Sequence, residues 1–211
     1  MKVLLVNGSP HKNGSTHTAL TEVAKTLNEE GIDTEIFWIG IKPLAGCIAC
    51  KKCAKTGRCA FNDRVNDFLD IAKDTDGYIF GSPVHYASVT GAMTSFMDRV
   101  FQVNSQSSNQ SFYLKPAAAV VCARRAGTTA TFDQLNKYFT ISEMPVISSR
   151  YWNMVHGAKP EDLEKDLEGL QTMRVLARNM AFFLKCKDAG LKTGVPLPVR
   201  EEKIYTNFIR D

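Results

Sequence analysis

The stretch VNGSPHKNGST, residues 6–16, decides the fold, because it joins an apolar run to an amphipathic helix. Residues 3–6 are continuously apolar, which predicts a strand buried on both faces of a parallel sheet. The helix that follows has one apolar face, made of Ala19, Leu20, Val23, Ala24 and Leu27. The stretch contains no acid, and the first acid of the helix is Glu22, well past its first turn. A donor-rich turn before an acid-free helix start predicts an anion-binding site.

The remaining chain alternates between strand and helix patterns. We expect further strands at 34–39, 77–81, 117–123 and 145–149, and helices at 65–72, 89–101, 132–139 and 160–185. The last helix should point inward with Leu163, Leu167, Leu170, Leu176, Met180 and Leu184. This alternation predicts an α/β three-layer sandwich: a five-stranded parallel sheet of flavodoxin-like order 2-1-3-4-5, with helices on both faces. We expect residues 1–211 to form one domain, with a cysteine-rich loop at 46–59 and a tail at 186–211.

Composition excludes several classes of protein. The 211 residues are 44% hydrophobic and 23% charged, which are ordinary globular values. A net charge of +4 without a basic stripe does not indicate nucleic acid binding. The longest apolar run lies near residues 117–123 and is far shorter than the roughly 18 residues of a membrane span. No signal-peptide pattern opens the sequence, so we expect a cytoplasmic protein without a membrane partner.

The first loop matches neither common nucleotide motif. A Walker A loop needs Gly-Lys-Ser/Thr where this chain has Gly14 followed by Ser15, and the Gly-x-Gly-x-x-Gly pattern is absent. The donors that remain for a phosphate are Ser9, His11, Asn13, Ser15 and Thr16 with the backbone around Gly14. The alternative is a self-capped surface turn with Ser15 as the N-cap.

Two further loops should lie at the same edge of the sheet. GSPVHYASVTGAMTSFMDR, residues 81–99, leaves the third strand and enters a helix capped by Ser88 or Thr90. Within it, Val84, His85 and Tyr86 offer a surface suited to a planar heterocycle, unless Tyr86 packs on its neighbours in an ordinary connection. CARRAGTT, residues 122–129, follows the fourth strand. Its Arg124 and Gly127 are candidates for a ligand contact, with a solvated arginine as the alternative.

The run GCIACKKCAKTGRC, residues 46–59, places four cysteines in the pattern C-x2-C-x2-C-x5-C. Cys47, Cys50, Cys53 and Cys59 are therefore candidate ligands of a [4Fe–4S] cluster, with zinc or free thiols as alternatives. The cations Lys42, Lys51, Lys52, Lys55 and Arg58 surround them and suit an acidic partner. The remaining cysteines, Cys122 and Cys186, are expected to be small buried hydrophobic residues.

The loops at 8–16 and 82–99 together resemble those of the NAD(P)H-dependent FMN reductases of flavodoxin fold. The resemblance implies that Ser9, Asn13, Ser15 and Thr16 bind the FMN phosphate, and that Pro83, Val84, Tyr86 and Ser88 lie along its ring. The chain departs from the family pattern in two places. His11-Lys12 stands where many members have an arginine, and the third loop lacks the usual glycine-rich, histidine-containing pattern.

The cysteine run resembles that of the iron–sulfur flavoproteins, a branch of the same superfamily. This resemblance implies FMN, a [4Fe–4S] cluster, ferredoxin as electron donor, a small-molecule electron acceptor and a homodimer or homotetramer. No side chain is expected to act as a catalytic residue, because the flavin supplies the chemistry. The alternatives are a plain NAD(P)H-dependent FMN or quinone reductase without a cluster, a flavodoxin-type electron carrier, and a zinc-stabilised binding module. A net charge of +4 argues against the carrier, since such carriers are usually acidic.

Overall fold

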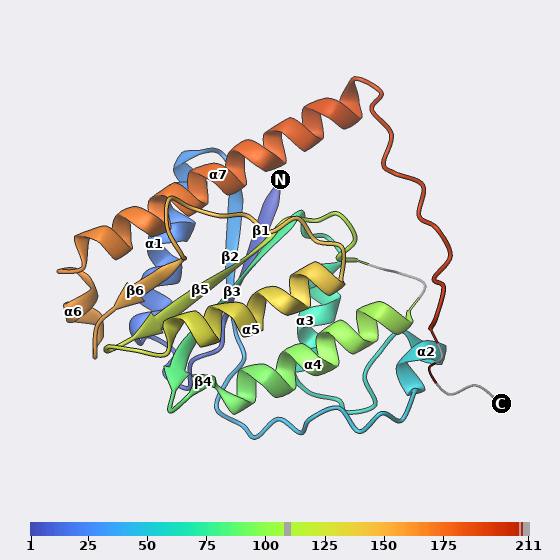
Figure 1. Cartoon of the computed structure of the whole chain (residues 1–211), viewed down its shortest axis with the longest axis horizontal. Helices are drawn as coiled ribbons and strands as arrows, with labels where there is room; N and C mark the ends of the chain where they lie inside the picture. The colour runs from blue at the N-terminus through green and yellow to red at the C-terminus, as the bar shows by residue number, and fades with distance from the viewer. Residues whose placement is uncertain (108–110, 207, 209–211) are drawn as a thin grey trace.

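The computed structural model describes residues 1–107, 111–206 and 208. Five parallel strands form its central sheet (Figure 1): β1 (Lys2–Asn7), β2 (Asp33–Trp38), β3 (Gly77–His85), β5 (Ala117–Ala123) and β6 (Met154–His156). Their order in the sheet is β2-β1-β3-β5-β6. Counted along the chain, these five strands have the predicted order 2-1-3-4-5, so the flavodoxin-like fold is confirmed. A two-residue strand, β4 (Ser88–Val89), pairs antiparallel with the end of β3.

Alternating strand residues supply two separate cores. Leu4 and Val6 of β1 point into one core, and Val3 and Leu5 point into the other. All four side chains are fully buried. This is the result of the two-residue period of a strand that is covered on both faces.

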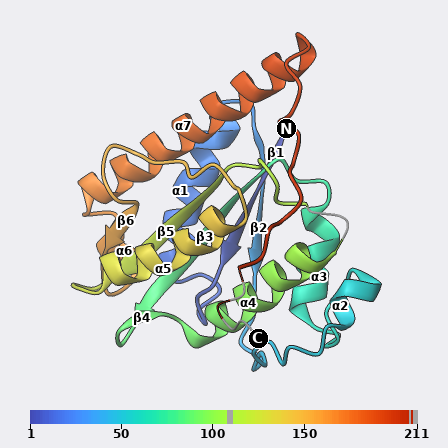
Figure 2. The same cartoon turned by 45° about the vertical axis from the view of Figure 1, so that its right-hand side comes forward.

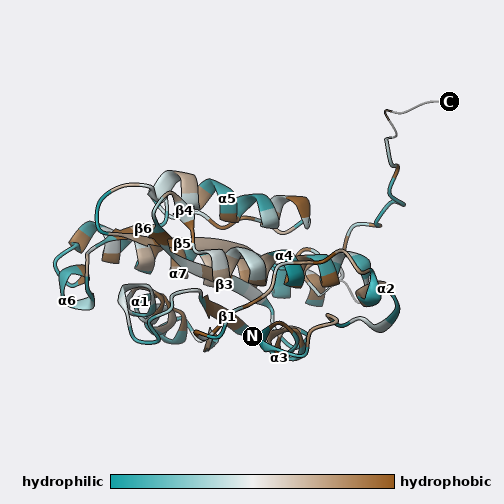
Figure 3. Cartoon of the chain, turned by 90° about the horizontal axis from the view of Figure 1, so that it is seen from below, coloured by the Kyte–Doolittle hydropathy of each residue, from teal (hydrophilic) through white to brown (hydrophobic). Residues whose placement is uncertain are grey.

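Seven helices of the described chain surround the sheet: α1 (Ser15–Glu29), α2 (Lys52–Thr56), α3 (Arg64–Ala72), α4 (Gly91–Gln106), α5 (Thr128–Ile141), α6 (Pro160–Leu163) and α7 (Leu167–Lys192). Residues of α3, α4 and α5 fill one core, and residues of α1 and α7 fill the other. Seen from below, the sheet runs between these two groups (Figure 3). Phe68 of α3 joins α4 and β2 to the first core, since its ring lies 5.2 Å from Phe96 and 5.5 Å from Phe37.

The fifth strand lies later in the chain than predicted. At 145–149 the chain makes one isolated bridge, between Val146 and Ala117, and the ladder resumes only at Met154–His156. The predicted stretch ends in Ser148 and Ser149, whereas Met154 and Val155 are a buried apolar pair that lies beside Val121 and Cys122 of β5. Burial of apolar side chains therefore decides which segment completes the sheet.

The C-terminal helical region also differs from the expectation. It divides at Asp166, whose carboxylate caps α7 by accepting a hydrogen bond from Gly169 N at 2.9 Å. Leu167 consequently lies at the start of α7 and is 73% exposed instead of pointing inward. Cys186 is exposed on the same helix, which corrects the expectation that it is buried.

The expected tail at 186–211 is shorter than predicted, because α7 continues to Lys192. Beyond the helix the described chain is extended and runs back along the body of the molecule (Figures 1 and 2), where Tyr113 donates its hydroxyl to Pro198 O at 3.4 Å and Arg200 forms an ion pair with Glu143. Residues 207 and 209–211 of this tail lie outside the described residues. Within the described chain, no helix combines the length and apolarity that crossing a membrane requires.

Candidate functional site

Three loops that follow β1, β3 and β5 line a cavity of about 310 Å³ at the carboxyl edge of the sheet. Parallel strands bring their ends to one edge, and the sheet order reverses beside β1, where ligands bind in open α/β folds. The cavity is lined by Ser9, His11, Ser15, Thr16, Pro83, Val84, His85, Cys122, Ala123, Arg124, Gly157 and Ala158. Asn13 and Gly14 line an adjoining hollow together with Trp38. The structure therefore brings together most of the predicted phosphate and ring residues.

The first loop is held in shape by side chains to which the sequence analysis gave no role in this loop. Trp38 donates its indole N–H to Ser9 O at 2.8 Å, and Thr90 donates its hydroxyl to Gly8 O at 3.1 Å. Asn7 bridges the loop internally, since it accepts from Ser9 N and donates to Lys12 O, both at 3.0 Å. These bonds satisfy the carbonyl groups of Gly8, Ser9 and Lys12. A polar Asn7 at the end of an apolar strand is the one signal that the sequence offered.

The start of α1 is open to an external anion. Its N-cap is Gly14, whereas the alternative of a self-capped turn required Ser15 at this position. The first turn of the described helix has no acid and no side-chain cap. The first N–H groups of a helix have no intrahelical acceptor and carry the positive end of the dipole. Thr16 is 1% exposed, and its hydroxyl has no hydrogen-bond partner among the described residues. A phosphate would satisfy these donors, so the loop fits the phosphate of FMN.

The Cys122 thiol lies beside the Thr16 hydroxyl at the base of the cavity. Burial raises the pKa of Cys122 to about 12, against the opposing effect of the nearby Thr16 hydroxyl. A thiol is a weak hydrogen-bonding group, so it does not replace a phosphate oxygen as a partner for Thr16. Cys122 is buried, as the sequence predicted, and it carries no charge at neutral pH.

The loop after β3, whose residues 83–88 are expected to lie along the flavin ring, is here named the ring loop. It forms a short hairpin in which His85 pairs with Ser88 and Val84 with Val89. Tyr86 stands at its tip, fully exposed and in the left-handed region at φ +54°, so it does not pack on its neighbours in this chain. The Ser88 hydroxyl donates to Gln134 Oε1 at 2.6 Å and thereby anchors the hairpin to α5. Of the two cap candidates, Thr90 caps α4, and its hydroxyl accepts from Met93 N at 3.2 Å.

The third loop contacts the ring loop through Gly127. A Cβ atom at this position would lie 2.7 Å from Val84 Cγ1, and the backbone has φ +89°, so glycine is required there. Gly127 therefore allows the two loops to approach each other. Arg124 lines the cavity with its side chain exposed, where it can face an anionic group.

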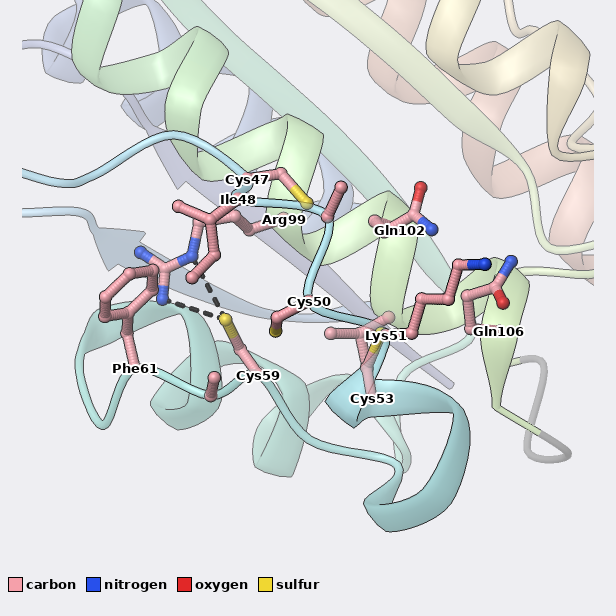
Figure 4. Close-up of a pocket in the computed structure, with 13 residues that line it drawn as sticks. Cys47, Ile48, Cys50, Lys51, Cys53, Cys59, Phe61, Arg99, Gln102 and Gln106 are labelled. Atoms are coloured by element: carbon pink, nitrogen blue, oxygen red, sulfur yellow. Dashed lines mark hydrogen bonds between the residues drawn. The ribbon is translucent and has the colours of Figure 1, made fainter.

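A second cavity, of about 150 Å³, lies beside α4 and is lined by all four cysteines of the run (Figure 4). Cys53 is buried at the start of α2, Cys59 is half-buried, and Cys47 and Cys50 are exposed. Ala49 and Lys51 adopt positive φ values of 51° and 56°, which turn the chain sharply between the first three cysteines. Such left-handed conformations are costly for residues other than glycine, and they occur here where the run curls around one cavity.

Hydrogen-bond donors surround the sulfur atoms. Arg99 of α4 donates to Cys59 Sγ from Nε at 3.2 Å and from Nη2 at 3.1 Å (Figure 4). Burial raises the pKa of the Cys53 thiol, while hydrogen bonds from the backbone N–H groups of Cys53 and Ala54 lower it, and Cys47 and Cys50 nearby raise it. Two of the four sulfur atoms, those of Cys53 and Cys59, therefore receive N–H donors.

The fourth cysteine is positioned by Asn66 of α3. Its side-chain amide accepts from Cys59 N at 2.9 Å and donates to Cys59 O at 3.1 Å and to Phe61 O at 2.9 Å. Neither Asn66 nor Arg99 was identified from the sequence, although Arg99 is the one basic residue of α4. The local charge is smaller than expected, because Arg58 forms an ion pair with Asp70 at 2.5 Å.

The four cysteines line one cavity, and a cluster and a single zinc ion place different demands on them. Within the described ranges, no three histidine, cysteine or acidic side chains converge closely enough to hold one metal ion. Structural zinc needs four ligands at about 2.0–2.3 Å from one point, whereas a [4Fe–4S] cluster binds its four thiolates at separate iron atoms. All four thiols line the same cavity and are therefore candidate ligands of one bound group.

Comparison with known proteins agrees with this geometry. The chain matches the family described as NADPH-dependent FMN reductase over residues 1–159. An iron-sulfur flavoprotein of Methanocaldococcus jannaschii is 33% identical over 192 residues, which are 88% of this chain and 98% of that protein. RosB, solved with bound 8-demethyl-8-formylriboflavin-5'-phosphate, has a TM-score of 0.68 at 13% identity, covering 100% of this chain and 94% of that one. A flavodoxin from the domain Archaea has a TM-score of 0.58 at 17% identity, covering 88% and 99%. At such identities the structural likenesses show the fold alone.

Proposed function

This chain belongs to the NADPH-dependent FMN reductase family, in its iron–sulfur flavoprotein branch, and on that premise we propose how its two cavities act together. It is a flavin-dependent oxidoreductase. We place FMN in the cavity at the ends of β1, β3 and β5, and a [4Fe–4S] cluster on Cys47, Cys50, Cys53 and Cys59. When bound, FMN supplies one- and two-electron redox chemistry, and the cluster supplies one-electron exchange.

The observation that carries the proposal is that all four thiols of the run line one cavity into which N–H donors point. For the flavin, the support is the buried, unpartnered Thr16 hydroxyl at the open start of α1. Ser9, Ser15 and Thr16 would hold the phosphate, and Pro83 and Val84 would lie along the ring. All five residues line the cavity. The helix α4 connects the two cavities, since Thr90 at its cap holds the phosphate loop and Arg99 reaches the cysteines.

The surface around the cysteine run supports an acidic one-electron donor such as ferredoxin. Lys42, Lys51, Lys52 and Lys55 are exposed there, and Lys51 lines the cavity itself. Clustered cations speed the encounter with an anionic partner and orient it. FMN bound in the neighbouring cavity would supply exchange with a small-molecule acceptor, and in the alternative of a plain reductase NAD(P)H would be the donor.

We also propose a homodimer or homotetramer in the cytoplasm. Tyr86 supports the oligomer, since a fully exposed aromatic side chain beside the flavin cavity is a surface that a second subunit would cover. All six cysteines are unpaired, which supports a reducing compartment.

Single Cys→Ser substitutions at the four positions test the cluster. Serine is a poor ligand because its alkoxide is disfavoured at neutral pH, so each change should remove most iron and sulfide from anaerobically prepared protein. Cys186→Ser is the matched control, because Cys186 is exposed on α7 and lines neither cavity. FMN should remain bound in all five variants. Reduction by ferredoxin should collapse in the four run variants, whereas direct reduction by NAD(P)H should survive.

One experimental outcome would contradict the proposed cluster. Wild-type protein that is reconstituted without oxygen, holds no iron and still turns over NAD(P)H would refute the cluster. The plain NAD(P)H-dependent flavin reductase would then be the function.

A further inference from the structure

Arg99 is the largest of the fully buried side chains that the structure describes, and it is charged. It comes from the middle of α4, and its side chain is 1% exposed. A guanidinium cannot be neutralised by losing its proton, so burying it is costly unless every N–H finds an acceptor. The partners of Arg99 therefore indicate what this charge is for.

One edge of the guanidinium is paired with a carboxylate. Nη1 lies 2.8 Å from Asp63 Oδ2, and Nη2 lies 2.9 Å from Asp63 Oδ1, in a bidentate arrangement. Asp63 is fixed in turn, since it is the N-cap of α3 and accepts from Val65 N at 3.2 Å. Nη1 also donates to Ala45 O at 3.3 Å, just before the cysteine run. The orientation of the guanidinium is thus set by two elements other than its own.

The other edge faces sulfur. Nε and Nη2 both donate to Cys59 Sγ, at 3.2 and 3.1 Å, while the ring of Phe61 lies 4.8 Å from the guanidinium carbon (Figure 4). A neutral thiol is a weak acceptor, and two buried donors directed at one thiol satisfy little. The same two donors directed at a thiolate form charge-assisted hydrogen bonds. The geometry is complementary to an anionic Cys59 sulfur.

Resting on the cluster proposed above, we propose that Arg99 positions the Cys59 thiolate as the fourth ligand and raises the reduction potential of the cluster. Adding an electron to a thiolate-bound cluster makes the site more negative, and hydrogen bonds to its sulfurs are one of the factors that set its potential. A fixed cation with two N–H groups on one ligand favours the reduced form. Arg99 is a positioning residue in this proposal, and it acts through Cys59.

The experiment is an anaerobic potentiometric titration of holoprotein that follows the cluster by its electron paramagnetic resonance signal and the flavin by absorbance. Arg99→Gln removes the charge. Arg99→Lys keeps the charge but removes the guanidinium group, which donates to Asp63 and Cys59 at the same time. Arg58→Gln is the matched control. Arg58 is an exposed cation of the cysteine run, forms an ion pair with Asp70 and does not line the cavity of the cysteines. Iron, sulfide and FMN are quantified in each preparation.

We expect Arg99→Gln to lower the reduction equilibrium constant of the cluster at least tenfold, a shift of 59 mV or more to lower potential. Arg99→Lys should shift it in the same direction by less, and Arg58→Gln by less than twofold. The flavin potential should be unchanged in all variants. Loss of the cluster from Arg99→Gln with FMN still bound, together with its retention in Arg58→Gln, also supports the positioning role.

Two results overturn the inference in distinguishable ways. If the wild-type protein binds no iron, both the proposed cluster function and this inference are wrong. A wild-type protein with its cluster, and Arg99 variants with full iron and an unchanged potential, would leave the function standing and make Arg99 a structural ion pair. If Arg99→Gln does not fold, the test depends on Arg99→Lys. An unshifted cluster potential in Arg99→Lys would contradict the proposed role of the guanidinium hydrogen bonds.

Discussion

A carboxylate placed at the start of α1 should weaken FMN binding without weakening the fold. Ser15 is the first residue of α1, lines the cavity and is half-buried, and the first turn has no other acid. In the FMN-free protein, Ser15→Asp puts a negative charge at the positive end of the helix. Such a change stabilises helices by about 0.3–1 kcal/mol. The melting temperature of the apoprotein should therefore stay the same or rise.

The same charge repels the phosphate. A carboxylate and a phosphate of about −2 charge, roughly 5 Å apart, repel by about 1.7 kcal/mol even at the dielectric constant of bulk water. The half-buried position of Ser15 lowers the effective dielectric constant, so this value is a lower bound before screening by salt. We expect the Kd for FMN to rise at least tenfold, which corresponds to about 1.4 kcal/mol.

The assay is a titration of apoprotein with FMN at physiological salt, followed by flavin fluorescence or calorimetry, beside thermal unfolding. Ser15→Asn controls for the size of the side chain, and Thr21→Asp places the same charge on an exposed position of α1. Six residues along a helix correspond to about 9 Å, beyond a Debye length at physiological salt. Both controls should bind FMN within about threefold of wild type. Unchanged affinity in Ser15→Asp, or equal weakening in Ser15→Asn, would refute a phosphate at this helix start.

Two further predictions concern the flavin cavity. The pigment released by heat should be FMN and not FAD, because the chain has one mononucleotide-type loop and no second dinucleotide motif; chromatography of the supernatant decides this, and FAD would contradict it. Burial raises the pKa of Cys122 to about 12 from an ordinary 9.0. Between pH 9.0 and about 12 the Cys122 thiol loses its proton in the unfolded chain but keeps it in the native state. The contribution of Cys122 to the free energy of unfolding therefore falls as pH rises, by up to about 1.4 kcal/mol per pH unit. Urea unfolding of apoprotein at pH values below and above 9.0 should show a shallower decline for Cys122→Ala, and parallel declines would contradict the burial argument.

Local patterns determined much of this protein. Continuous apolar runs predicted the buried strands β1, β3 and β5, because a strand covered on both faces has no polar side to hide the signal. The acid-free start of α1 and the four-cysteine spacing were also readable, since both features are complete within a few residues of chain. The gathering of the predicted phosphate and ring residues followed from the parallel order, which brings strand ends together.

Contacts between distant residues decided the rest. Thr90 reaches Gly8 across 82 positions, and Arg99 reaches Cys59 across 40, so neither partner can be recognised from its own neighbourhood in the sequence. The position of β6 depended on which apolar pair fits beside Val121–Ala123, a packing choice that a window around 145–149 does not contain. Periodicity and spacing are properties of a segment, whereas the satisfaction of a buried charge or a loop carbonyl is a property of the packed molecule. For this reason the cysteines were visible in the sequence, and the arginine that holds one of them appeared only in the structure.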